Sequence, residues 1–273
     1  MCELFALSSS SATEVSFSLD EFAKHGGLTD HHRHGWGIAY YAQNTARIIK
    51  EAHQASNSSC LNFVKNYSMK STIILSHIRY ATQGEVSFRN TQPFSRELAG
   101  REHVFIHNGD LIGIAENPKF QSKCFMPMGE TDSEVAFCYL LTLMAEIWQD
   151  SHEPKLELRH KVFYDFAEEM HTLGLANFIY SDSEYIYIYS HERKIKDKKN
   201  KTKYIIVPGL YVLQRKCFKE ITDTSIKGLK MPKKQPKSVI LVSSVPLNNE
   251  NWQALDAQTS FVLKNGEITQ SHF

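Results

Sequence analysis

Two stretches of helical character interrupt a sequence that otherwise consists of short strand-like segments. The first, DSEVAFCYLLTLMAEIW, starts at Asp132 and carries apolar residues around most of a helix surface, with Thr131 or Asp132 as its cap. The second, residues 156–173, is more amphipathic and stops at Gly174. Two such helices lying side by side on a sheet would form one helical layer, which restricts the chain to folds that combine sheets with a helical cover.

Strand-like segments rich in β-branched and aromatic residues flank the helical stretches on both sides. They are residues 3–8, 36–41, 72–78, 103–107, 175–180, 185–190 and 238–243. The short polar turn at residues 181–183 predicts a hairpin, and a short helix is expected at residues 18–25, stopped by Gly26 and Gly27. We expect one α+β domain over residues 2–273, in which sheets pack on each other and helices cover them.

Composition points to a small-molecule substrate. The chain has 31 basic and 30 acidic residues and a formal net charge of +1, so nothing favours nucleic acid or an anionic membrane. The basic run at residues 193–203 is poor in apolar residues and is expected to be a solvated loop. The N-terminus lacks the features of a signal peptide, and no segment approaches the roughly 18 apolar residues of a membrane span. We therefore expect a cytoplasmic protein.

Cysteine and histidine spacing predicts neither disulfides nor a metal site. Five cysteines are scattered without a C-x-x-C pair, at Cys2, Cys60, Cys124, Cys138 and Cys217. Four histidines lie close in sequence but lack a helical i, i+4 pair or a cysteine partner, namely His25, His31, His32 and His34. A P-loop and a dinucleotide-binding fingerprint are also missing, so we expect no cofactor.

Cys2 has chemistry of its own because it follows the initiator methionine. Removal of Met1 would leave one residue with both a thiol and a free α-amine. Their ordinary pKa values, about 8.5 and about 7.7–8.0, let a proton pass between them near neutral pH, directly or through one water. Cys2 would then be a nucleophile with its own base. Taken alone, Cys2 is better explained as a small apolar residue that opens a strand.

Downstream motifs offer the other groups that acyl transfer needs. Arg79 follows the apolar segment TIILSHI and can clamp a carboxylate with two parallel hydrogen bonds, to which Thr82 could add a third. The alternative for Arg79 is an ordinary surface arginine.

The segment FIHNGDL contains an Asn-Gly pair, which usually marks a tight turn. Alternatively, the Asn108 side-chain amide and the Gly109 N–H form the donor pair of an oxyanion hole, where glycine lets the backbone approach the substrate.

Two further motifs have structural explanations beside the functional ones. GETDSE, residues 129–134, is a helix-capping sequence, yet Asp132 could also receive the α-ammonium group of an amino-acid substrate. In HGWGIA, the glycines on both sides of Trp36 suggest close backbone packing near the N-terminal strand.

Taken together and in this order, Cys2, HGWGIA, SHIRYAT, NTQPF, HNGDL and GETDSE resemble the glutaminase domain of class-II glutamine amidotransferases, members of the N-terminal-nucleophile hydrolases. The motifs cover about residues 2–140. The remainder, with its strand-rich end containing SSVPLNNENW, is similar to small stand-alone bacterial members. Similar proteins often read H-x-D-G-W-G and N-T-H-P-F, where this chain has His34 and Gln92.

The resemblance implies a four-layer αββα sandwich and hydrolysis of the γ-amide of glutamine, or of a related γ-glutamyl compound, through a cysteine thioester. It implies Cys2 as nucleophile, with its own amine as base, and Asn108 and Gly109 as the oxyanion hole. The substrate would be held by Arg79 and Thr82 at its α-carboxylate and by Asp132 at its α-ammonium group, with Gly35 and Trp36 helping to wall the site.

Three alternatives follow from the same residues. Without an acceptor domain in the sequence, either a partner protein takes up any ammonia or the enzyme is a simple hydrolase. A second hypothesis is a catalytically silent or partner-dependent binding subunit, which retention of Met1 would favour. The third, a papain-type hydrolase using Cys60, Cys124 or Cys138 with a histidine, has little support because none of these cysteines has flanking glycines in a strand-to-helix context.

Overall fold

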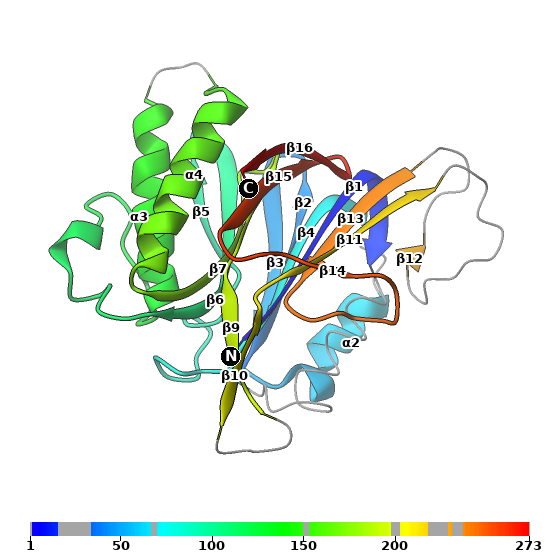
Figure 1. Cartoon of the computed structure of the whole chain (residues 1–273), viewed down its shortest axis with the longest axis horizontal. Helices are drawn as coiled ribbons and strands as arrows, with labels where there is room; N and C mark the ends of the chain where they lie inside the picture. The colour runs from blue at the N-terminus through cyan, green and yellow to red at the C-terminus, as the bar shows by residue number, and fades with distance from the viewer. Residues whose placement is uncertain are drawn as a thin grey trace.

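Two antiparallel sheets pack face to face, and helices cover both outer faces (Figure 1). The computed structural model describes residues 2–15, 34–66, 70–149, 153–197, 203–217, 229–230 and 237–272. In order across the fold the layers are helices α3 (Asp132–Ile147) and α4 (Leu156–His171), a six-stranded sheet called sheet B, an eight-stranded sheet called sheet A, and helix α2 (Ser59–Asn66). This is the expected αββα sandwich.

Sheet A has the strand order β14-β11-β13-β1-β4-β2-β3, and β12 pairs with β1. Its strands are β1 Glu3–Val15, β2 Trp36–Ala42, β3 Thr45–Glu51, β4 Lys70–Ile78, β11 Tyr211–Cys217, β12 Leu229–Lys230, β13 Lys237–Ser243 and β14 Gln253–Ala254. Sheet B has the order β16-β15-β8-β7-β6-β5. Its strands are β5 Phe94–Leu98, β6 Arg101–Leu111, β7 Gly174–Ser181, β8 Ile186–Ser190, β15 Thr259–Lys264 and β16 Glu267–His272.

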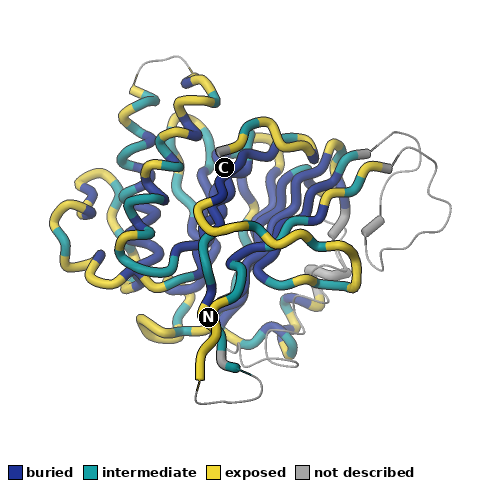
Figure 2. The backbone as a smooth tube through the Cα atoms, in the orientation of Figure 1, coloured by how far each residue is buried: buried dark blue, intermediate teal, exposed yellow. Residues whose placement is uncertain are grey.

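All seven predicted strands are confirmed, and most of them are longer than the sequence pattern indicated. The expected hairpin is also present, because β7 and β8 pair in antiparallel register on either side of the turn at residues 182–185. The apolar core forms three layers, which appear as buried backbone through the centre of the molecule (Figure 2). In β1, Leu4 and Ala6 face the space between the sheets, whereas Phe5 and Leu7 face the outer side of sheet A.

Both long helices are confirmed and lie side by side on sheet B. Helix α3 spans Asp132–Ile147, and the Thr131 hydroxyl accepts a hydrogen bond from the Glu134 N–H at 3.3 Å, as a capping residue does. Helix α4 spans Leu156–His171. The apolar face of α3 packs on the sheet through Phe137, whose ring stacks on Phe105 with 5.3 Å between centroids. The opposite layer contains η1, Ala55–Asn57, and α2, Ser59–Asn66.

The structure corrects two expectations. The basic run at residues 193–203 is not simply a solvated loop, because β9 Glu192–Lys196 pairs with β10 Tyr204–Pro208 as a two-stranded ribbon. The Asn-Gly pair does not form a turn either, since Asn108 and Gly109 lie within β6 and pair with β7. The helix expected at residues 18–25, its two glycines and three of the four clustered histidines lie outside the described residues.

Candidate active site

The Cys2 thiol lies beside the backbone that leaves β4. Its sulfur accepts a hydrogen bond from the Tyr80 N–H at 3.3 Å and lies 3.5 Å from the Tyr80 carbonyl oxygen. Strand pairing produces this contact, because β1 and β4 run antiparallel with Glu3 opposite Ile78. The start of β1 therefore meets the end of β4, where the sequence had placed Arg79.

Asn108 reaches Cys2 from the other sheet. Its side-chain Nδ2 donates a hydrogen bond to the Cys2 carbonyl oxygen. The side chain of Asn108 lies on the same side of β6 as Val104 and Ile106, which face the space between the sheets. Cys2 directly precedes β1, in which Leu4 faces the same space. The two residues therefore meet at one end of the layer between the sheets.

Strand parity assigns the N–H of Gly109 to the edge of β6 that faces away from β7. The N–H groups of His107 and Leu111 bond to side chains outside that strand, those of Gln92 and Asp132. Gly109 lies between them, and the direction of the backbone groups in an antiparallel strand alternates with period two, so its N–H faces the same edge. A side chain at Gly109 would collide with the Leu175 carbonyl oxygen, which explains the glycine.

Arg79 is buried, and its guanidinium is engaged with the following loop. It donates to the carbonyl oxygens of Glu85 at 2.8 Å, Gln83 at 2.9 Å and Gly84 at 3.3 Å. These bonds use three of the five donors of a guanidinium. The surface-arginine alternative is thereby wrong, because only 3% of Arg79 is exposed.

Asp132 lies at the first turn of α3 and is also buried. Its Oδ2 accepts a hydrogen bond from the Leu111 N–H at 2.9 Å, and its Oδ1 accepts one from the Ser133 N–H at 2.8 Å. The carboxylate therefore joins the helix start to the end of β6. Asp132 is also the residue that the sequence analysis offered as the partner of an α-ammonium group.

Burial raises the pKa of the Cys2 thiol above its ordinary value. The hydrogen bond from the Tyr80 backbone and the positive charge of Arg79 act against that increase, while the negative charge of Asp132 adds to it. Both charged groups therefore act on the thiol. The structure brings Cys2, Asn108, Arg79 and Asp132 into one neighbourhood.

The side chain of Trp36, one of the predicted residues, is not brought into this neighbourhood. Trp36 lies on the same side of β2 as Ile38, in the core of the outer face of sheet A, and its Nε1 donates to Glu51 at 3.1 Å. Only the backbone of its neighbour approaches the site, since the Gly35 carbonyl accepts from the Arg79 N–H at 2.8 Å. Thr82 is exposed.

His107 is not oriented toward Cys2, although it directly precedes Asn108. Its ring lies on the helix side of β6, where it stacks on Phe178 with 4.8 Å between centroids. Its Nδ1 lies 2.9 Å from the Ser133 hydroxyl, and burial lowers the pKa of the imidazole.

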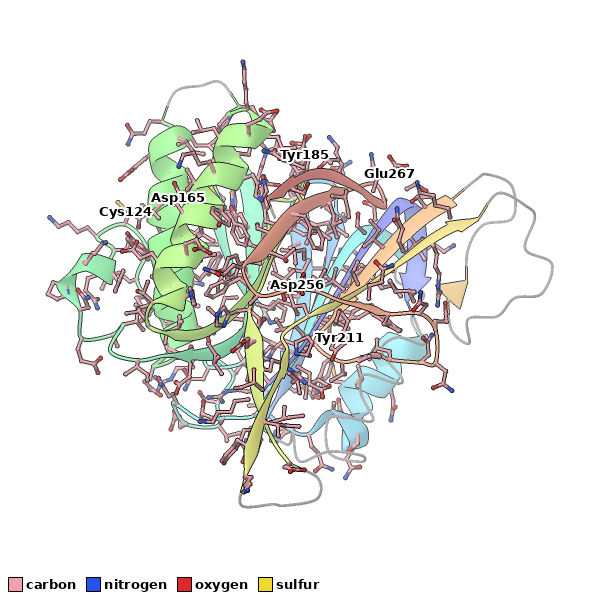
Figure 3. The ribbon with its side chains drawn as sticks, viewed as in Figure 1. Cys124, Asp165, Tyr185, Tyr211, Asp256 and Glu267 are labelled. Atoms are coloured by element: carbon pink, nitrogen blue, oxygen red, sulfur yellow. The ribbon has the colours of Figure 1, made fainter. Side chains whose placement is uncertain are left out.

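The remaining cysteines have different surroundings. Cys138 is buried within α3, where burial raises its pKa to about 11 and so disfavours the thiolate. Cys60 is half-buried in α2, and Cys124 is exposed on the loop outside the helical layer (Figure 3). Within the residues that the structure describes, no group of three or more His, Cys, Asp or Glu side chains could hold a metal ion.

Sequence reasoning missed the residues that hold the loop between β4 and β5. Asn90 is buried, and its side chain bonds the Glu130 carboxylate at 2.9 Å and accepts from the Glu130 N–H at 2.9 Å. Gln92 was noted only as a difference from similar proteins, yet its amide bonds the backbone of β6. Both belong to the NTQPF motif, which was the available signal.

A family model described as class-II glutamine amidotransferases matches residues 1–272. The chain belongs to this family. Class-II glutamine amidotransferases act on the amide of glutamine by transfer or hydrolysis, and this chain has their N-terminal-nucleophile hydrolase fold. None of its described helices is long and apolar enough to cross a membrane.

Individual relatives agree with the family match. This chain is 32% identical over 277 residues to a Haemophilus influenzae protein named "Putative glutamine amidotransferase", covering 98% of this chain and 85% of that protein. It is 36% identical over 189 residues to "Putative glutamine amidotransferase YafJ" of Escherichia coli K12, covering 69% and 72%. A crystal structure titled as a "predicted glutamine amidotransferase" from Pseudomonas aeruginosa superposes with a TM-score of 0.69 at 25% identity, covering 98% of this chain and 100% of that one.

Proposed function

We propose that residues 2–273 act as one catalytic domain that hydrolyses the γ-amide of glutamine, or of a related γ-glutamyl compound, through a thioester on Cys2. The observation that carries the proposal is the meeting of Cys2 and Asn108 from two different sheets. A nucleophile and a side-chain amide donor in contact are the two parts that acyl transfer requires. The buried opposite charges of Arg79 and Asp132 nearby support an amino-acid substrate.

The first half of the reaction would cleave the amide. After Met1 is removed, the thiol passes its proton to the α-amine of the same residue, and the thiolate attacks the amide carbonyl carbon. The carbonyl oxygen becomes negative, and the Asn108 Nδ2 and Gly109 N–H stabilise it. An amide nitrogen carries two hydrogens, so Asn108 can keep its bond to the Cys2 carbonyl and give the second to the substrate. The protonated amine then gives its proton to the leaving nitrogen, and ammonia departs.

The second half would release the acid. Water loses a proton to the same α-amine and attacks the thioester carbon, and the carbon–sulfur bond breaks to give a γ-carboxylate and the restored thiol. The location of His107 on the far side of β6 supports the amine as the base. Ammonia would either leave with the product or pass to an acceptor protein.

Substrate recognition would rest on both ends of the amino acid. Arg79, together with the exposed Thr82, would hold the α-carboxylate, and Asp132 would hold the α-ammonium group. Three donors of Arg79 hold the loop at residues 83–85, so the same guanidinium would shape the pocket and bind the substrate. The Gly35 backbone would form part of the wall.

Replacement of Arg79 by lysine is expected to raise KM for glutamine by about tenfold or more, with a smaller change in kcat. An ammonium group cannot reproduce the planar, paired contact, and one hydrogen bond to a charged group contributes about 1.5–3 kcal/mol. Steady-state kinetics checks this, with Arg89→Lys as control because Arg89 is a half-exposed arginine of the same loop. An Arg79→Lys variant with unchanged KM would remove the clamp from the proposal.

The function itself is tested by a substrate panel. Glutamine, glutathione and other γ-glutamyl compounds are incubated with the purified chain, and the release of ammonia or of the corresponding amine is measured together with the γ-carboxylate product. At least one γ-glutamyl compound is expected to be hydrolysed, while α-linked amides with the same leaving group are not. Absence of turnover across the panel, in protein shown to lack Met1, would contradict the proposed hydrolase and support a partner-dependent subunit.

A further inference from the structure

One edge of β6 loses its neighbouring strand just before the candidate oxyanion-hole residues. Strand β5 pairs with β6 only up to the pair Phe94 and Phe105. On the other side, β7 continues to pair with β6 as far as Leu111. The backbone groups of His107, Gly109 and Leu111 on the open edge must therefore find partners other than a strand.

The side-chain amide of Gln92 supplies such partners at His107. Its Oε1 accepts a hydrogen bond from the His107 N–H at 2.6 Å, and its Nε2 donates to the His107 carbonyl oxygen at 3.3 Å. This pair of bonds is what an opposite residue in a neighbouring strand would make. Further along β6, Asp132 accepts a hydrogen bond from the Leu111 N–H. Gly109 lies midway between these two side-chain contacts.

The backbone that carries Gln92 is itself fixed from sheet A. A side chain at Gly37 would collide with the Gln92 carbonyl oxygen and lie 2.7 Å from the ring of Pro93, so β2 packs directly on this segment. The Lys50 ammonium donates to the Thr91 carbonyl oxygen at 2.7 Å. Only 5% of Gln92 is exposed. Its amide is therefore a rigid link from sheet A to β6.

We propose that Gln92 is a positioning residue for the oxyanion hole: by bonding both backbone groups of His107, it sets where Asn108 Nδ2 and the Gly109 N–H stand relative to Cys2. The inference rests on the proposed function. Donors in an oxyanion hole act through preorganisation, and a misplacement of about 1 Å can cost on the order of 10²-fold in rate. Gln92 touches neither the substrate nor Cys2 and acts through the strand.

The test compares Gln92→Met with Gln121→Met in the full chain. Methionine keeps the length of the side chain and removes both the acceptor oxygen and the donor nitrogen of the amide. Gln121 is an exposed glutamine whose Nε2 also donates to a backbone carbonyl, that of Ala115 at 2.7 Å, so it controls for loss of one such bond elsewhere. Gln92→Met is expected to lower kcat for glutamine by on the order of tenfold to 10²-fold, with KM changed less than about threefold, while Gln121→Met matches the wild type.

Gln92→Glu gives a second readout that a purely structural role would not change. The carboxylate keeps an acceptor for the His107 N–H, but its second oxygen faces the His107 carbonyl and cannot donate until it is protonated. The kcat of this variant, divided by that of the wild type at the same pH, is expected to rise as the pH falls, because the protonated acid restores the donor. This readout also covers the case in which Gln92→Met does not fold.

The outcomes separate the two proposals. A wild type that hydrolyses glutamine, with a folded Gln92→Met variant of unchanged kcat, overturns this inference and leaves the proposed function intact. A Gln92→Glu ratio that does not vary with pH also overturns it. A wild type that hydrolyses no γ-glutamyl compound overturns the proposed function and this inference together.

Discussion

Replacement of Cys2 by alanine is expected to reduce glutamine hydrolysis by on the order of 10⁶-fold, which places it below detection in most assays. The variant retains the α-amine, the oxyanion donors and the substrate clamp, but it has no atom that can form the thioester. Removal of a nucleophile therefore costs more than removal of any group that only stabilises charge. The measurement is glutamate formation at saturating glutamine, with thermal unfolding as evidence of an intact fold.

The matched control is Cys124→Ala. Cys124 is an exposed thiol on a loop outside the helical layer, so its removal is expected to leave turnover unchanged (Figure 3). Cys2→Ser is a stricter comparison, because serine keeps an oxygen at the position of the sulfur while raising the pKa of the nucleophile far above that of the amine. It should also be nearly inactive. Substantial turnover in Cys2→Ala would show that another residue attacks the substrate.

Replacement of Asn108 by alanine is expected to lower kcat by on the order of 10²–10³-fold, with a much smaller change in KM. The amide is worth most when the substrate oxygen carries a full negative charge, so its loss acts on the transition state rather than on substrate binding. The bond from Nδ2 to the Cys2 carbonyl would be lost as well, which removes a link between the two sheets.

Asn117→Ala is the control for this variant. Asn117 caps a short helical turn, where its Oδ1 accepts from the Lys119 N–H at 3.0 Å, and it lies in an exposed loop. Its loss is expected to leave kcat unchanged. A drop in thermal stability of Asn108→Ala without a drop in kcat would assign Asn108 a purely structural role and exclude it from the oxyanion hole.

Much of the fold could be predicted from local patterns. The apolar run after Thr131 predicted α3, and the amphipathic stretch at residues 156–173 predicted α4. The β-branched segments predicted the central strands, because these are buried over a long, regular stretch. The edge strand β3, TARIIKE, was missed because it mixes charged and apolar residues, as half-buried edge strands do. The ribbon of β9 and β10 was missed because the basic run at residues 193–203 is poor in apolar residues and was interpreted as a solvated loop.

The candidate site was predicted as a set of residues, but its geometry was not. Motifs identified Cys2, Arg79, Asn108 and Asp132. The structure adds that they meet where the start of β1 lies beside the end of β4 and the last residues of β6. Side-chain directions depend on strand parity and on which sheet a strand joins, so the direction of Trp36 could not be deduced from its motif. The proposed role of Gln92 could not be predicted from the sequence, because it depends on where β5 stops pairing with β6.

In the proposed reaction Cys2, freed from Met1, is the attacking residue. The most direct measurement is mass spectrometry of the protein after reaction with the glutamine analogue diazo-oxo-norleucine. One adduct is expected, on an N-terminal peptide that begins with Cys2 and lacks Met1. An adduct on any other residue, or labelling of a chain that still carries Met1, would contradict this reaction.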